Sequence, residues 1–360
     1  MRRSILQILS VAGTLSALCI SIAAQKAPSS SDHQIVIQSD GTVEAPARAV
    51  PPSIFLTPEA KAYLSEHLHQ MQMPMGSGQQ PDNGVPGFLK RYLDRDKEKF
   101  PVIQTDEKIA GIHVYVFVPK AGVTPKNKNR VLINLHGGGF SGCWPGCAEL
   151  ESIPISALMG VKVISVDYRE APDYKFPAAS EDVAKVYQDL LKTYKPKSIG
   201  IYGCSAGGMQ TSMSLAWFQT HGLPTPGAAG IFCAPAGPFG GDANYIAFPL
   251  GEARISSATP SHSQLQYFST ANVNDPLVVP TNSPEMLAKF PPTLLITATR
   301  DFALSGALYS DIQLTKAGVD SELHVWDGLF HGFFYDSDIP ESKEAFNIMV
   351  KFFDAHLATR

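Results

Sequence analysis

The feature that most constrains the fold is a regular alternation of short apolar segments with segments of helix length. The expected strands are residues 112–119, 131–135, 161–168, 198–204, 230–236, 293–299 and 322–326. The expected helices are residues 149–159, 178–194, 206–220, 304–317 and 341–357. Such alternation is typical of βαβ units, so it predicts an α/β protein with a doubly wound, mostly parallel sheet.

Composition limits the classes of partner. The chain has 360 residues, of which 44% are hydrophobic and 17% are charged, and its formal net charge is −4. These proportions suit a soluble globular protein with a large core. A weakly acidic chain offers no electrostatic attraction to nucleic acid or to an anionic membrane surface, so neither is expected as a partner.

The first residues have the layout of a secretory signal peptide, which we assign to residues 1–24. Arg2 and Arg3 precede an uncharged, mostly apolar run that ends in small residues at Ala23 and Ala24. This pattern predicts cleavage near Ala24 and an exported protein, periplasmic or secreted, without a stable membrane partner. The alternative is an uncleaved membrane anchor.

Composition and helix signals suggest the remaining divisions. Residues 25–53 are rich in Ser, Ala and Pro and predict a flexible leader. Residues 54–100 form an N-terminal segment in which a helix is expected, because Thr57 and Pro58 form a helix start that is followed by apolar residues on one face. The α/β domain covers residues 101–360. Within it, residues 237–290 break the alternation and predict an insertion over the edge of the sheet where such folds bind ligands.

A nucleophilic serine is predicted at the end of the strand 198–204. Residues 203–207 read Gly-Cys-Ser-Ala-Gly and stand between that strand and the next helix. In this setting the G-x-S-x-G pattern is typical of a nucleophile elbow, a tight turn that leaves the serine Oγ free. Ser205 is therefore the candidate nucleophile. The alternative is a glycine-rich turn without catalytic function.

Serine needs a base, and the base needs an orienting acid. In hydrolases with such an elbow, the acid and then the histidine follow the serine along the chain. His331 lies just after the last predicted strand, and Asp301 follows the strand 293–299. We expect both at the same edge of the sheet as Ser205. Asp327 and Asp275 are the rival acids, and His324 is a less favoured base because it lies within a strand.

A second glycine-rich segment follows the strand 131–135, and residues 136–139 read His-Gly-Gly-Gly. Acyl transfer passes through an oxyanion that backbone N–H groups must meet at hydrogen-bond distance. Glycines allow that approach, so Gly138, Gly139 and Ala206 are the predicted oxyanion hole, and His136 is expected to hold the loop. A phosphate cradle is the weaker alternative, since no Lys-Ser/Thr pair follows.

Four cysteines remain beyond the signal peptide: Cys143, Cys147, Cys204 and Cys233. In an exported protein a bridge between Cys143 and Cys147 is geometrically possible. Four small buried side chains are an equal alternative. Zinc is disfavoured, because no histidine pair stands nearby at ligand spacing.

The motifs together resemble those of the hormone-sensitive lipase family of α/β-hydrolase esterases, from about residue 101 to the end of the chain. The resemblance rests on the motifs HGGGF, VDYREAPDYKFPAASED, GCSAGG, NDPLVVP, PPTLLITATRD and FHGF. The resemblance implies the α/β-hydrolase fold, a triad of Ser205, Asp301 and His331, and neither metal nor cofactor. It also implies a helical cap built from N-terminal helices in residues 54–100, with residues 237–290 as a candidate contributor. Cys204 stands where the family commonly has Asp or Thr, and Glu170 stands where it has Leu.

The expected activity is hydrolysis of small or short-chain carboxylic esters through an acyl-enzyme. Phe140 and Trp144 are predicted to contact the substrate. An amidase or lactonase with the same triad is one alternative, and a non-catalytic ligand-binding protein of this fold is another. The oligomeric state stays open, with a homodimer as one alternative.

Overall fold

A computed structural model describes residues 35–73, 85–255, 261–262 and 265–359. The chain divides into two units, residues 1–50 and residues 51–360. The predicted signal peptide and residues 25–34 of the predicted leader lie outside the described residues. Among the described helices, none combines the length and the apolar character that crossing a membrane requires.

The described part of the first unit contains a short antiparallel pair, β1 (Val36–Ile37) and β2 (Val43–Glu44). Gly41, with φ 87°, lies in the turn between them. The predicted leader is therefore not irregular throughout, because β-branched residues flank a glycine turn.

The second unit is built on an eight-stranded sheet. Its strands, in spatial order, are β10 (Ser321–Phe330), β9 (Thr293–Arg300), β8 (Ala228–Phe232), β7 (Ile199–Cys204), β5 (Val131–Leu135), β6 (Lys162–Val166), β4 (Ile112–Pro119) and β3 (Val102–Ile109). Each pair of adjacent strands from β10 to β6 is parallel, whereas β4 is antiparallel to both β6 and β3. The predicted mostly parallel α/β sheet is thus confirmed.

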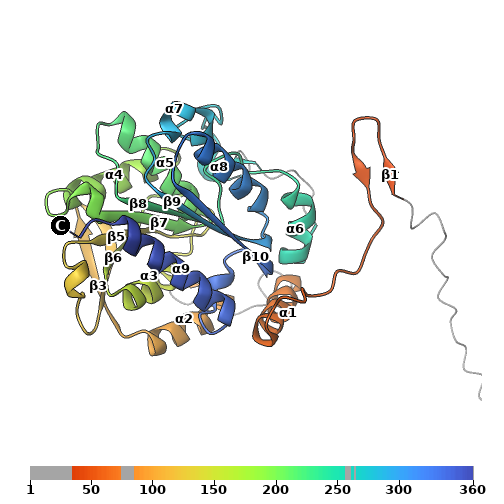
Figure 1. Ribbon diagram of the computed structural model, residues 1–360, viewed down its shortest axis with the longest axis horizontal. Helices are drawn as coiled ribbons and strands as arrows, with labels where there is room; N and C mark the ends of the chain where they lie inside the picture. The colour runs from red at the N-terminus through yellow and green to blue at the C-terminus, as the bar shows by residue number, and fades with distance from the viewer. Residues whose placement is uncertain (1–34, 74–84, 256–260, 263–264, 360) are drawn as a thin grey trace, which may run out of the picture. The chain divides into compact units, whose positions relative to one another are not determined.

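Helices cover both faces of this sheet (Figure 1). One face carries α3 (Gly146–Met159) and α9 (Pro340–His356), and the other carries α4 (Ala178–Leu190), α5 (Ala206–Thr220) and α8 (Leu304–Lys316). Strand side chains alternate between two separate cores. In β5, Leu132 joins the core under α3 and α9, whereas Val131 and Ile133 join the opposite core. This alternation follows from the pleat of a strand whose two faces are both covered.

Three further helices lie at the edge of the sheet where the parallel strands end. They are α1 (Pro58–Gln72), α2 (Gly87–Lys99) and α6 (Ala243–Glu252), and α6 belongs to the predicted insertion. Thr57 caps α1, because its side chain accepts a hydrogen bond from the Ala60 N–H. The short α7 (Pro284–Leu287) lies beside α5 and α8.

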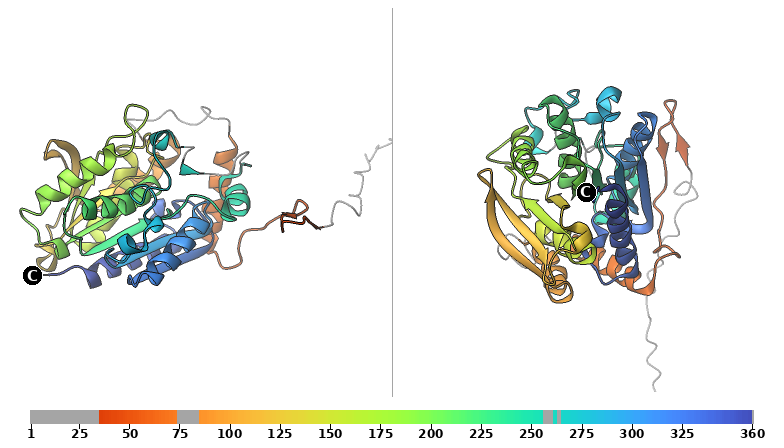
Figure 2. Two further views of the ribbon diagram at one scale, coloured as in Figure 1. Left: turned by 90° about the horizontal axis from the view of Figure 1, so that it is seen from above. Right: turned by 60° about the vertical axis from the view of Figure 1, so that its left-hand side comes forward.

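Several predicted boundaries were wrong. Strand β3 was missed, since most of its side chains are exposed at the edge of the sheet, where Figure 2 shows the β3–β4 hairpin. Helix α3 begins three residues earlier than predicted, at Gly146, and α4 ends earlier, at Leu190. Strand β10 extends to Phe330.

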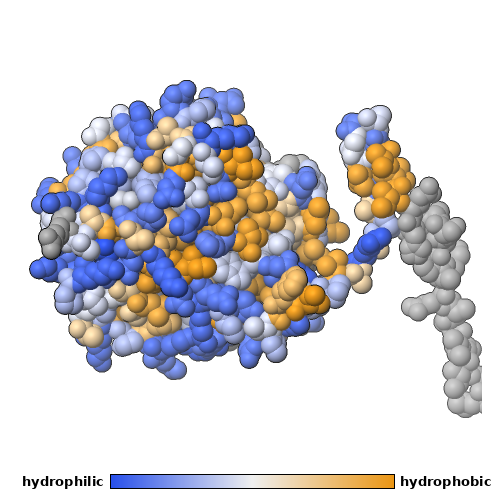
Figure 3. All heavy atoms as spheres, in the orientation of Figure 1, coloured by the Kyte–Doolittle hydropathy of each residue, from blue (hydrophilic) through white to orange (hydrophobic). Residues whose placement is uncertain are grey.

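On the face seen in Figure 3, apolar residues gather over α8, where Leu308, Tyr309 and Ile312 are exposed.

Candidate active site

Ser205 occupies the turn between β7 and α5 in a strained conformation. Its φ is 57° and its ψ is −122°, outside the regions that non-glycine residues normally adopt. Its N–H donates to the Phe232 carbonyl at 2.8 Å, and its own carbonyl accepts the Met209 N–H at 3.1 Å. These two bonds hold the turn from both sides and leave the half-buried hydroxyl in a cavity, as the elbow prediction requires.

Two glycines allow the end of β5 to approach this turn. A Cβ on Gly203 would lie 2.2 Å from the Leu135 carbonyl oxygen, and a Cβ on Gly207 would lie 1.7 Å from the same atom. No side chain fits at either position. The close contact places the glycine-rich loop, residues 136–142, directly beside Ser205.

Asp301 and His331 form a pair at the ends of the neighbouring strands β9 and β10. The Nδ1 of His331 lies 2.8 Å from the Oδ1 of Asp301. Asp301 is fully buried and also accepts hydrogen bonds from the Thr297 hydroxyl and the Ala303 N–H, each at 2.8 Å. Three donors therefore fix the carboxylate, and the carboxylate fixes the imidazole.

The charges of the pair support each other. Burial alone raises the pKa of Asp301, but the charge and hydrogen bond of His331 outweigh it and lower that pKa. Burial alone lowers the pKa of His331, but the carboxylate of Asp301 outweighs it and raises that pKa. The Phe302 ring also stacks on the imidazole, with centroids 4.1 Å apart.

The rival residues make other contacts. Asp327 accepts from the hydroxyls of Ser53 and Thr299, the latter at 3.1 Å. Asp275 accepts the Leu277 N–H at 2.8 Å within the insertion. His324 lies 3.5 Å from Glu322 on strand β10. Only Asp301, of the three candidate acids, contacts His331.

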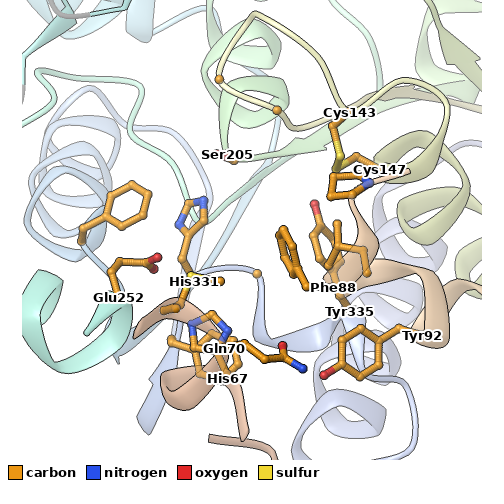
Figure 4. Close-up of a pocket in the computed structure, with 18 of the residues that line it drawn as sticks. His67, Gln70, Phe88, Tyr92, Cys143, Cys147, Ser205, Glu252, His331 and Tyr335 are labelled. Atoms are coloured by element: carbon orange, nitrogen blue, oxygen red, sulfur yellow. A yellow bond between two sulfur atoms is a disulfide. The ribbon is translucent and has the colours of Figure 1, made fainter. Parts of the chain in front are cut away.

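Ser205 and His331 face one cavity of about 470 Å³, and Figure 4 shows the two side by side. The floor is formed by the glycine-rich loop and the loops after the strands, and the remaining walls come from α1, α2, α6 and the first turn of α3. Apolar side chains dominate, and Gln70, His67 and Glu252 add polar groups. The full lining is Tyr63, His67, Gln70, Met71, Pro86, Phe88, Leu89, Tyr92, Gly138, Gly139, Gly142, Cys143, Cys147, Ser205, Glu252, Phe302, Phe330, His331, Gly332 and Tyr335.

The predicted oxyanion residues lie in this cavity or at its base. Gly138 has φ 122° and Gly139 has φ 66°, both in the region that favours glycine. Ala206 is the first residue of α5, so its N–H has no carbonyl one turn earlier in that helix. The structure therefore brings all three predicted donors to the side of Ser205.

His136 is fully buried, as expected for a residue that holds the loop. Its Nδ1 lies 2.7 Å from the Gly137 carbonyl, and its ring stacks on Tyr168 with centroids 4.5 Å apart. The Tyr168 hydroxyl donates to the His136 carbonyl at 2.5 Å. Burial lowers the pKa of His136 to about 4, so the ring stays neutral.

The prediction that Phe140 and Trp144 contact substrate is wrong for this structure. Phe140 is completely buried and stacks on Tyr267 with centroids 4.8 Å apart. Its φ of 58° turns the side chain into the core beneath the loop. Trp144 packs against His113 and Tyr115. Neither residue lines the cavity; Phe88, Phe302 and Phe330 supply its phenylalanine rings instead.

The cysteines divide into two pairs. Cys143 and Cys147 form a disulfide, with their Cα atoms 5.4 Å apart, which resolves the alternatives that the sequence left open. Cys204 and Cys233 are buried and free. Cys233, Asp301 and His331 have potential metal-binding atoms within 4.8 Å of one another. In this structure Asp301 and His331 are hydrogen-bonded to each other, and the sulfur of Cys233 accepts a hydrogen bond from the Gly332 N–H at 3.3 Å.

Sequence reasoning missed three residues around the site. Glu252, at the end of α6, lines the cavity, and its charge contributes to the raised pKa of His331. His67, from α1, stacks on Phe330 and bonds through Nε2 to the Gly251 carbonyl at 2.9 Å. Glu151, from α3, is fully buried beneath the loops. No motif distinguishes any of them from other polar residues in helices.

Comparisons with known proteins agree with this geometry. Residues 132–335 match the model of a family described as having the alpha/beta hydrolase fold. The chain is 25% identical over 225 residues to an acetyl-hydrolase of Streptomyces hygroscopicus, a match that covers 62% of this chain and 75% of that protein. It is 24% identical over 279 residues to an esterase of Acinetobacter venetianus, covering 75% of this chain and 89% of the relative.

Solved structures show the same architecture. A crystal structure of an esterase designated E25 superposes with a TM-score of 0.72 at 27% identity, over 88% of this chain and 99% of that one. The crystal structure of an esterase from the bacterial hormone-sensitive lipase family gives a TM-score of 0.69 at 22% identity, over 84% of this chain and 99% of the other.

Proposed function

This chain belongs to the α/β-hydrolase fold family and is a serine ester hydrolase, and we propose that it cleaves short-chain carboxylic esters in the manner of hormone-sensitive lipase relatives. One observation carries the proposal. A serine held at φ 57° shares a cavity with a histidine that is bonded to a buried aspartate at 2.8 Å. The acetyl-hydrolase and esterase relatives support the same bond specificity.

In the proposed mechanism His331 accepts the proton of the Ser205 hydroxyl while the serine oxygen attacks the ester carbonyl. Asp301 stabilises the imidazolium that forms. The N–H groups of Gly138, Gly139 and Ala206 donate to the carbonyl oxygen as it becomes an oxyanion. His331 then donates its proton to the leaving alkoxide, and an acyl-enzyme remains.

Water completes the reaction by the same groups. His331 removes a proton from a water molecule, which attacks the acyl carbonyl, and the oxyanion donors act a second time. Collapse of this intermediate returns the proton to Ser205 and releases the carboxylic acid. No step in this proposal uses a metal or a cofactor.

The walls of the cavity support short acyl groups. Phe302 stacks on His331, and Phe330 and Met71 face the same space. A cavity of about 470 Å³ accommodates a small ester together with its alcohol. We expect acetyl or butyryl esters to be preferred over long-chain esters, because these apolar side chains line the space beside His331.

The nucleophile and its partners are tested by substitution. Ser205→Ala and His331→Ala should each lower kcat on p-nitrophenyl butyrate by about four to six orders of magnitude, because triad members act as a unit. Asp301→Asn should cost about four orders of magnitude. The kcat of Asp327→Asn should stay within about threefold of the parent value, since Asp327 touches neither Ser205 nor His331. Circular dichroism and thermal melting check that each variant is folded.

A labelling experiment separates an enzyme from a non-catalytic binding protein. A p-nitrophenyl phosphonate should release one equivalent of p-nitrophenol from the parent and none from Ser205→Ala. Release by Ser205→Ala, or loss of turnover in Asp327→Asn but not in Asp301→Asn, contradicts the assigned triad.

We also propose that the protein is exported. The signal-peptide pattern of residues 1–24 suggests it. The Cys143–Cys147 disulfide supports it, since such bonds persist in oxidising compartments. Fractionation of cells that express the full chain tests the proposal, and a product that stays in the cytoplasm at full length contradicts it.

A further inference from the structure

We propose that Glu151 is a positioning residue that holds the oxyanion donors, the nucleophile elbow and the catalytic histidine in one arrangement. The inference rests on the proposed ester hydrolysis and adds a residue that touches no reacting atom. Glu151 lies on α3 with 2% of its surface exposed, and it does not line the substrate cavity described above.

Four hydrogen bonds converge on the carboxylate of Glu151. Its Oε1 accepts the Gly137 N–H at 2.9 Å and the Tyr335 hydroxyl at 2.8 Å. Its Oε2 accepts the Asn134 amide at 2.8 Å and the Cys204 N–H at 3.3 Å. The four donors come from segments that are far apart in the sequence, with Tyr335 184 residues from Glu151.

Three of the four donors belong to loops that carry groups acting in the proposed reaction. Gly137 precedes Gly138, so its peptide sets the direction of the oxyanion loop. Cys204 precedes Ser205 and ends β7. Tyr335 closes the short loop, residues 331–335, that begins with His331. One side chain therefore ties together the three loops whose relative positions decide how well the transition state fits, and displacements of about 1 Å matter there.

The hydrogen bonds require an ionised carboxylate. All four partners donate, and only a carboxylate accepts at every site. The side-chain amide of Asn134 is held in this orientation, because its oxygen accepts a hydrogen bond from the Ser165 hydroxyl. Burial raises the pKa of Glu151 to about 7, and the four donors oppose that rise. The charged form is thus present above neutral pH.

Stability alone does not account for this carboxylate. Among the described residues, no lysine, arginine or histidine forms an ion pair with Glu151, although neighbouring Glu149 pairs with Lys97 at 2.8 Å. A buried charge without a counter-ion carries a desolvation cost that well-packed apolar residues avoid. We attribute the carboxylate to positioning, because a single rigid side chain accepts hydrogen bonds from the N–H groups of Gly137, beside the oxyanion loop, and Cys204, beside the nucleophile.

The charge has a second effect, on the base. The carboxylate of Glu151 is one of the groups that raise the pKa of His331, after Asp301 and Glu252. Removing this charge disfavours the imidazolium and lowers that pKa. The acid limb of the kcat/KM profile should then move to lower pH, a change that a merely structural defect does not produce.

The test replaces Glu151 with glutamine, which keeps the shape but has one acceptor oxygen. When that oxygen faces Gly137 and Tyr335, the new amide points at the Asn134 amide, and two donors oppose each other. We expect Glu151→Gln to lower kcat on p-nitrophenyl butyrate by about 10- to 100-fold, less than loss of a full oxyanion donor. KM should change by less than about threefold, because the donors matter most in the transition state.

A second substitution should rescue the first. Asn134→Asp in the Glu151→Gln background gives the new amide an acceptor, and the carboxylate introduced at position 134 can still accept the Ser165 hydroxyl. This double variant should recover at least about tenfold in kcat and return the acid limb toward the parent position. Glu149→Gln is the matched control: it removes a buried carboxylate two residues away that contacts none of the three loops, and kcat should stay unchanged.

Tyr335→Phe keeps the proposal testable if Glu151→Gln fails to fold. It removes one hydrogen bond to Oε1 and should lower kcat by about three- to tenfold with an unchanged fold. The proposal is overturned if folded Glu151→Gln or Tyr335→Phe keeps kcat within about twofold of the parent, or if Glu149→Gln loses as much activity. It is also overturned if Asn134→Asp fails to rescue kcat. Failure of the proposed function would look different, because the parent itself would neither turn over esters nor react with the phosphonate.

Discussion

At the scale of single residues, two adjacent glycines with positive φ have different surroundings. A Cβ on Gly138 would lie 2.0 Å from the Gly142 carbonyl oxygen and 2.8 Å from the Cβ of Cys143. The nearest atom to a Cβ on Gly139 is the Ser141 hydroxyl at 3.8 Å. Gly138 therefore needs both its conformation and its missing side chain, whereas Gly139 needs mainly its conformation, with φ 66°.

Alanine substitutions at the two positions should distinguish the need for a positive φ from the need for a missing side chain. Gly138→Ala forces the loop to move, so kcat should fall by about 10²–10³-fold together with the melting temperature. Gly139→Ala has room and costs about 1–2 kcal/mol of backbone strain, so its melting temperature should fall while kcat stays within about tenfold. Steady-state kinetics and thermal melts of both variants provide the measurement. A larger kcat loss in Gly139→Ala than in Gly138→Ala contradicts this account.

At the scale of elements, the disulfide joins the glycine-rich loop to the helix that follows it. Cys143 directly follows the loop and Cys147 lies in the first turn of α3, the helix that also carries Glu151. Both cysteines line the cavity beside Gly138 and Gly139. The Cys147 N–H bonds to the Cys143 carbonyl at 2.9 Å, so backbone and side chain close the same short turn.

Replacing both cysteines by serine should lower stability more than it lowers activity. Closing a loop with a sequence separation of 4 is worth about 2 kcal/mol in the chain-entropy model. The free energy of unfolding should fall by about that amount, and kcat by about three- to tenfold, because the backbone bond and Glu151 still hold the loop. Treating the parent with a phosphine reductant should reproduce both changes, and the double variant should not respond to it. A parent whose kcat rises on reduction contradicts the prediction.

At the scale of the whole molecule, buried acids make stability depend on pH. Burial raises the pKa of Glu170 to about 8 and that of Asp96 to about 7. An acid whose pKa is raised by folding stabilises the fold below its unfolded pKa, and this stability is lost as pH rises through the folded value. The contribution of Glu170 therefore disappears between about pH 4.5 and 8. Its Oε1 is buried and has no hydrogen-bond partner within the described part of the chain.

Glu170→Gln should remove this loss without changing the shape of the side chain. At about pH 8 the variant should melt at least about 2 °C above the parent, and this difference should shrink steadily as the pH falls toward about 4.5. Melting curves across this range provide the measurement, and Glu98→Gln at an exposed site of α2 serves as the control for a lost surface charge. A variant that is less stable than the parent at the higher pH would falsify the assignment of Glu170 as a buried, unfavourable charge.

The order of the elements and the identity of the predicted triad could be read from the amino-acid sequence alone. The alternation of apolar strands with helices is a local property, visible wherever side chains face a covered sheet. Ser205, Asp301 and His331 each follow a strand, and the ends of parallel strands meet at one edge. Their approach could therefore be predicted without knowing a single side-chain contact.

The side chains that face the cavity, and the contacts that hold its loops together, emerged only from the packing of the folded chain. Phe140 was predicted to contact substrate, but its positive φ directs it into the core. Strand β3 was missed because its exposed charges hide the strand pattern. Glu151 meets Gly137, Cys204 and Tyr335 only after α3 has packed on the sheet. Contacts of this kind join residues that share no local pattern, so they depend on the packing of whole elements rather than on sequence spacing.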